Sequence, residues 1–137
     1  MKTNLDGFTV TDEKLEAEGI EFEYGPVIFT LRRFGGRNPK LKASYAKHFK
    51  PNARAIEMKT IEESKLEDIT IRAFIDSCLV KWEGLKGEDG NEIPCTPETA
   101  YKLFKERLEL FNTLFDYARD HKNFLKDEFF QAESMGN

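Results

Sequence analysis

The stretch from Ile20 to Phe34, IEFEYGPVIFTLRRF, determines the class of fold. Apolar and polar residues alternate along it on both sides of the dipeptide Gly25-Pro26. The residues that share a face are Ile20, Phe22 and Tyr24 before the dipeptide, and Val27, Phe29 and Leu31 after it. A period of two in β-branched and aromatic residues around a Gly-Pro break predicts an antiparallel β-hairpin.

This hairpin needs further structure against it, because two strands alone are only marginally stable in water. The segment Gly7-Phe8-Thr9-Val10 is a candidate third strand, and helical patterns follow from residue 37. We therefore predict an α+β fold in which an N-terminal antiparallel β-hairpin packs on a mainly α-helical body. The length predicts a single domain over residues 1–137, with a hairpin region at 1–36 and a helical region at 37–137.

A first helix start follows the hairpin. Asn38-Pro39 has the form of an N-cap followed by proline at the first helical position, and Pro51 predicts an end near Phe49. The expected apolar stripe of this helix is Leu41, Tyr45 and His48 or Phe49. A turn or short helix is expected over residues 52–58.

Thr60 and Glu63 fit a capping box for a long helix through Trp82. Its second half, ITIRAFIDSCLVKW, is apolar nearly all round, which predicts a central, buried helix. The residues expected to be largely buried are Phe74, Ile75 and Leu79.

The C-terminal part is predicted to be helical from Pro97 to about Glu133, with a break near residues 106–109. Twelve phenylalanines in 137 residues are many, and six of them lie in this region. A thick hydrophobic core explains such a stripe, and so does a second apolar face that contacts a partner. The candidate partner-binding anchors are Phe104, Phe111, Phe115 and Phe124.

Charge is unevenly distributed although the net charge is only −4. Residues 31–59 carry nine basic side chains and one acidic side chain, whereas residues 1–30 and 60–137 are both acidic. Such a block is typical of a solvated face, of a protein contact or of a nucleic-acid surface. Opposite charges on one chain also favour self-association, so a homo-oligomer is expected.

The sequence lacks the residue patterns of catalytic and metal sites. Cys78 and Cys95 are too few for a disulfide framework and are expected to be reduced thiols. His48 and His121 have no zinc-ligand spacing to either cysteine, and no cofactor motif is present. No apolar run reaches the length of about 18–20 residues that spans a membrane. We therefore predict a protein without enzymatic activity, metal or cofactor, and a Cys95 nucleophile is the weakest alternative.

The segment LVKWEGLKGEDGNEIPCTPETAYKLF is the most distinctive in the chain. It resembles the tail assembly chaperone of long-tailed bacteriophages, in which a Trp-x-Gly precedes an Asp-Gly-x-x-x-Pro loop and a Ser/Thr-Pro-Glu helix start. The matching positions are Trp82, Gly84, Asp89, Gly90, Pro94, Thr96 and Pro97. The strand Gly19–Tyr24 and the closing segment NFLKDEFFQAES are also similar, so the resemblance covers most of the chain.

Each motif position also has a purely structural explanation. Gly84 suits a left-handed helix cap after Trp82, Asp89-Gly90 suits a turn, and Thr96 suits an N-cap. None of these roles requires catalysis.

The resemblance implies a protein of the host bacterial cytoplasm that is absent from the mature virion. It would bind the phage tape measure protein, keep it soluble and help recruit tail tube subunits. A longer product made by ribosomal frameshifting near the C-terminus is implied for the tail tube contact. The codons GGA and AAC for Gly136-Asn137, after Met135, would supply a slippery sequence. The alternative is a structural head–tail or nucleic-acid-binding phage protein that uses residues 31–59, whose DNA binding would weaken steeply with salt.

Overall fold

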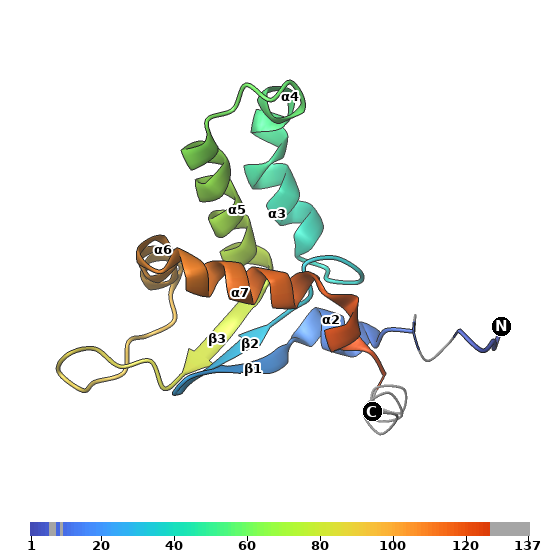
Figure 1. The fold of residues 1–137 in the computed structure, drawn as a ribbon, viewed down its shortest axis with the longest axis horizontal. Coiled ribbons are helices and arrows are strands. Elements are labelled where there is room, and N and C mark those ends of the chain that lie inside the picture. The colour runs from blue at the N-terminus through green and yellow to red at the C-terminus, as the bar shows by residue number, and fades with distance from the viewer. Residues whose placement is uncertain (6–7, 9, 127–137) are drawn as a thin grey trace.

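The computed structural model describes residues 1–5, 8 and 10–126, and these form the α+β fold that the sequence predicts (Figure 1). The helices are α2 (Glu13–Glu18), α3 (Leu41–His48), α4 (Ala53–Glu57), α5 (Glu63–Ser77), α6 (Pro97–Glu106) and α7 (Leu108–Arg119). The strands are β1 (Ile20–Tyr24), β2 (Val27–Leu31) and β3 (Leu79–Glu83), and the 3-10 turns are η1 (Lys50–Asn52) and η2 (His121–Phe124).

The predicted hairpin is confirmed: β1 and β2 pair antiparallel, with Phe22 opposite Phe29. Gly25 takes the left-handed conformation at the turn, with a φ of 58°. The third strand of the sheet is β3, which pairs antiparallel with β2 and places Trp82 opposite Phe29. The segment proposed as a third strand lies partly outside the described residues, and Val10 belongs to no strand.

One prediction about the central helix is wrong. The helix α5 ends at Ser77, and the chain enters β3 at Leu79, so Trp82 lies on a strand and not at a helix end. The capping box is also absent, since Glu62 is the N-cap and no side chain caps it. The expected burial of Phe74, Ile75 and Leu79 is confirmed.

The core lies between one face of the sheet and helices α5, α6 and α7, and Figure 1 shows α7 running across the sheet. Phe74 stands at the centre of the aromatic cluster, with its ring edge-on to those of Phe104, Phe111 and Phe115. This packing depends on the predicted break between two C-terminal helices, which falls at Arg107. No helix of the described residues is long and apolar enough to cross a membrane.

Helices α3 and α5 rise from this body as an antiparallel pair with α4 at its far end (Figure 1). We call this projection, residues 41–77, the arm. The stripe predicted for α3 is only partly right, because Ser44 is its buried residue whereas Tyr45 is exposed. The N-cap of α3 is Lys40, and Asn38 precedes it as a buried side chain.

Candidate functional site

The predicted aromatic anchors are core residues in the structure. Phe104, Phe111 and Phe124 are buried. Phe115 is half-buried, stacks on Phe111 and carries the guanidinium of Arg119 over its ring at 4.5 Å. The C-terminal stripe therefore covers α5 and the sheet, and it leaves no row of exposed phenylalanines for a partner along α6 and α7.

The motif residues Trp82 and Gly84 hold the loop that follows β3. The indole Nε1–H of Trp82 donates to the carbonyl of Ile93 at 2.7 Å. Gly84 has a φ of 85°, and a Cβ there would lie 2.5 Å from the carbonyl oxygen of Pro26. Gly84 therefore allows the loop to pass close to the β-hairpin, which is a different role from the helix cap that we predicted.

The remaining motif residues shape the same loop and start α6. Asp89 accepts a hydrogen bond from the backbone of Asn91 at 3.0 Å, and Gly90 has a φ of 83°, as expected of a turn. The Thr96 side chain caps α6, and Thr99 donates back to the carbonyl of Pro94 at 2.6 Å. The predicted N-cap, with Pro97 in the first helical turn, is confirmed. These roles are structural.

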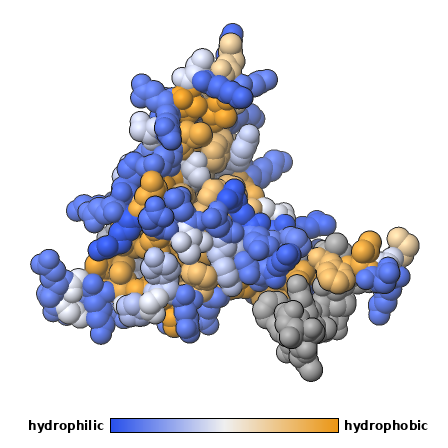
Figure 2. Space-filling model, viewed as in Figure 1, coloured by the Kyte–Doolittle hydropathy of each residue, from blue (hydrophilic) through white to orange (hydrophobic). Residues whose placement is uncertain are grey.

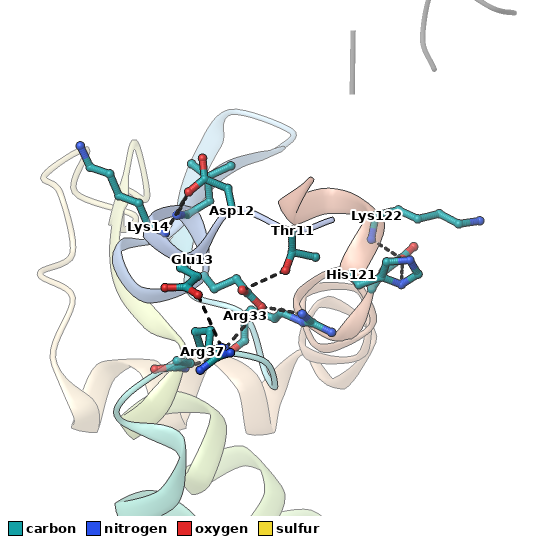
Figure 3. Close-up of polar contacts among 12 residues, drawn as sticks. Thr11, Asp12, Glu13, Lys14, Arg33, Arg37, His121 and Lys122 are labelled. Atoms are coloured by element: carbon teal, nitrogen blue, oxygen red, sulfur yellow. Dashed lines mark hydrogen bonds and ion pairs between the residues drawn. The ribbon is translucent and has the colours of Figure 1, made fainter. Parts of the chain in front are cut away.

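The first arginines of the basic block fasten α2 to the end of β2 (Figure 3). Arg32 donates from Nε to the carbonyl of Ala17 at 2.8 Å, and Arg37 lies 3.7 Å from Glu13. Arg33 forms an ion pair of 2.5 Å with Glu16, which is only 1% exposed. A buried carboxylate is tolerated only when it is paired and hydrogen-bonded. These arginines therefore stabilise the packing of α2 on β2, a structural role that the sequence did not indicate.

The segment that precedes α2 meets the segment that follows α7 beside this ion pair. Thr11 donates to Glu16 at 3.1 Å and forms an isolated antiparallel bridge with Leu125. The backbone of Asp12 donates to the carbonyl of Phe124 at 2.7 Å, which explains why Phe124 is buried. Phe124 is thus held against the start of α2, at the end of the body.

The basic block is therefore not one continuous cationic surface. Lys47 is also paired, at 3.8 Å from Asp76. The exposed cations of the block that form no ion pair with any described residue are Lys40, Lys42, Lys50, Arg54 and Lys59. They lie on or beside the arm and share it with Glu57, Glu62 and Glu63.

Buried polar side chains hold the two helices of the arm together and join the arm to the body. The amide Nδ2 of Asn38 donates to the carbonyls of Arg33 and Ser77, at 2.9 and 2.8 Å. Ser44 donates to the carbonyl of Ala73 at 2.9 Å, which brings α3 close to α5. Because buried polar groups must find specific partners, these bonds define the direction of the arm.

The far end of the arm exposes apolar side chains. Tyr45 is 55% exposed and Met58 is 61% exposed, and the Tyr45 ring stacks on Phe49 with centroids 5.3 Å apart. Ile56 and Ile61 are half-buried beside them in sequence. Figure 2 shows hydrophobic surface gathered on this part of the arm. We call Tyr45, Phe49, Ile56, Met58 and Ile61 the arm tip.

Sequence analysis did not identify the arm tip, because residues 53–61 follow no single helical face. The only signal was the presence of Ile56, Met58 and Ile61 among charged residues in a short helical segment. Such isolated apolar residues are usually covered by the protein itself.

The two cysteines are not activated. Burial raises the pKa of Cys78 to about 12, although the Ser77 hydroxyl and Arg32 act in the opposite direction. Burial also raises the pKa of Cys95, which is only half-buried. A thiol with a raised pKa is a poor nucleophile at neutral pH. In the described part of the chain, no three His, Cys, Asp or Glu side chains come together as a metal site would require.

These features define a small α+β protein with a helical arm whose tip exposes apolar side chains. A family model described as YdaY prophage protein matches residues 37–137, which includes the arm and the helices beyond it. The chain belongs to this family and is a phage-derived protein. No curated protein and no solved structure matches it.

Proposed function

We propose that this protein is a non-enzymatic tail assembly chaperone that binds the tape measure protein of its phage in the host cytoplasm. It keeps that protein soluble, helps recruit tail tube subunits through a longer frameshifted product, and does not remain in the virion. The proposal is supported by the phage origin of the family and by the resemblance of the segment from Trp82 to Pro97. The residues at which frameshifting was expected, 135–137, lie outside the described residues.

The observation that carries the proposal is the exposed arm tip. A tape measure protein is long and helical, and the apolar face of such a helix is insoluble until another apolar surface covers it. Covering a fully exposed large apolar side chain contributes about 1.5–3 kcal/mol, and each partly exposed side chain of the arm tip contributes a share of this. The contact is made by surface complementarity alone and requires no reacting group.

The test is co-expression of the chain with the tape measure protein of the same prophage. We expect the soluble fraction of the tape measure protein to rise with the wild-type chain. The double variant Tyr45→Ser/Met58→Ser should lose this effect with little change in melting temperature, since both side chains are more than half exposed. Tyr24→Ser is the matched control, because Tyr24 is an exposed aromatic residue on the β-hairpin.

Failure of the wild-type chain to solubilise the tape measure protein would overturn the proposed function. Equal loss with Tyr24→Ser would show that the arm tip is not the contact. Salt-sensitive binding of the chain to DNA, abolished by Lys50→Glu/Arg54→Glu, would instead favour the nucleic-acid alternative.

A further inference from the structure

A groove crosses the base of the arm where α3, α5 and the start of α6 meet. One hollow of about 550 Å³ is lined by Arg72, Pro97, Tyr101 and Lys102, among others. A second hollow of about 220 Å³ shares the first three of these residues and extends to His48 and Asp76. No residue of the arm tip lines either hollow, so the groove is a separate surface.

Arg72 stands at the centre of the groove in a fixed orientation. Its guanidinium lies over the ring of Tyr101, 4.1 Å from the centroid, and its Nε donates to Asp68 at 3.0 Å. The Tyr101 hydroxyl donates to the same carboxylate. Burial acts to raise the pKa of Asp68, but the hydrogen bonds from Tyr101 and Arg72 outweigh it and the pKa is lowered. Asp68 is therefore a carboxylate at neutral pH and holds the guanidinium in place.

This arrangement leaves the outer edge of the guanidinium available. Neither Nη1 nor Nη2 of Arg72 forms an ion pair with a described residue, and the side chain is 50% exposed. An arginine that is already oriented by stacking and by Nε loses little rotational freedom when it binds a carboxylate with its two Nη groups. The groove thus presents the two Nη groups of Arg72 as hydrogen-bond donors that are already oriented.

Lys102 supplies a second cation that is available to a ligand in the groove. Lys102 is exposed and forms no ion pair with any described residue. Asp76 is already engaged by His48 at 2.5 Å and by Lys47 at 3.8 Å. Glu98 is the one further acidic residue lining these two hollows. Pro97 and the Tyr101 ring supply an apolar wall beside these cations.

We propose that this groove binds an acidic peptide segment of a protein partner, with a carboxylate on the Nη groups of Arg72 and a second on Lys102. An apolar side chain between the two carboxylates packs against Pro97 and Tyr101. The Thr96-Pro97 helix start then has a second role, because the cap at Thr96 places Pro97 on the wall of the groove.

The test measures fluorescence anisotropy of a labelled peptide of alternating glutamate and phenylalanine, with full-length protein. A peptide with glutamine in place of glutamate is the control ligand. We expect saturable binding of the glutamate peptide, at least about tenfold weaker binding of the glutamine peptide, and weakening with added salt.

Arg72→Lys tests whether binding needs the planar guanidinium or only a positive charge, because lysine keeps the charge but lacks the pair of Nη donors. We expect it to weaken binding about tenfold. Lys102→Gln should weaken binding severalfold without touching the contact between α5 and α6. Lys50→Gln, an exposed arm cation outside the groove, should change binding less than about twofold.

Equal binding of the two peptides, or wild-type binding by both Arg72→Lys and Lys102→Gln, would overturn this inference. An equal loss with Lys50→Gln would also overturn it, because that result indicates diffuse attraction. None of these results bears on solubilisation of the tape measure protein by the arm tip, so the two proposals fail independently.

Discussion

Replacing Phe74 by alanine should remove the centre of the core. The side chain is fully buried, and three phenylalanine rings meet it edge-on with centroids 5.4–6.0 Å away. Truncation of a buried phenylalanine costs about 3–5 kcal/mol, and lost aromatic pairs add about 0.5–1.5 kcal/mol each where they do not repack. We therefore expect Phe74→Ala to lower the free energy of unfolding by about 4–5 kcal/mol. A loss of this size is a large fraction of the total stability of an ordinary domain.

Urea denaturation provides the measurement, followed by far-ultraviolet circular dichroism and by the fluorescence of the single tryptophan. Trp82 is buried and belongs to the same core, so both signals should report one transition. Phe8→Ala makes the same chemical change at a side chain that is 63% exposed, and it should cost less than about 0.5 kcal/mol. A loss below about 1.5 kcal/mol for Phe74→Ala, or equal losses for the two variants, would refute the central position of Phe74.

Three further outcomes are expected. Gly36→Ala should lower the free energy of unfolding by at least about 2 kcal/mol, because its Cβ would lie 1.7 Å from the buried, ion-paired carboxylate of Glu16. The control in urea denaturation is Gly25→Ala, which has a similar φ but nothing within 4 Å of its Cβ, and it should lower the free energy of unfolding clearly less. Because the pKa of Asp68 is lowered in the folded protein, the ionised carboxylate stabilises the fold at pH values above its unfolded pKa of about 3.9, and this stabilisation is lost as the pH falls through the folded pKa. When the pH is lowered from about 6 to about 3, the free energy of unfolding of Asp68→Asn should therefore fall by less than that of the wild type. Light scattering at micromolar concentration should give a mass above that of a monomer at low salt, falling as salt screens the charged regions; a strict monomer at both low and moderate salt would count against self-association.

The parts of the fold that follow from local pattern were predictable. The alternation around Gly25-Pro26 gave β1 and β2, and the Thr96-Pro97 signature located the start of α6. These signals are complete within a few neighbouring residues, so no distant contact is needed to interpret them.

The end of α5 was not predictable in the same way. Residues Ile69 to Trp82 are apolar nearly all round, which fits a buried helix as well as a helix followed by a buried strand. The pairing of β3 with β2 is a long-range contact that decides between the two. The irregularity between Thr30 and Leu31 in the register of this pair further obscures the alternation of β3.

The candidate site was missed for a related reason. Helical periodicity shows that Phe104 and Phe111 share an apolar face, but it does not show what covers that face, which is Phe74 within the same chain. Conversely, hydrophobicity alone predicts that Tyr45 is buried, but the buried residue of its helix is Ser44 and Tyr45 is exposed. The basic block was ambiguous because the acidic partners of Arg33 and Arg37 lie in α2, before the β-hairpin.

Hydrogen–deuterium exchange of the chain, alone and with its tape measure protein, is the decisive test of the arm tip as the contact surface, because it locates the contact without any substitution. We predict slower amide exchange over residues 45–61 in the complex, with little change over β1 and β2. Protection confined to the sheet or to α7, with the arm unchanged, would contradict it.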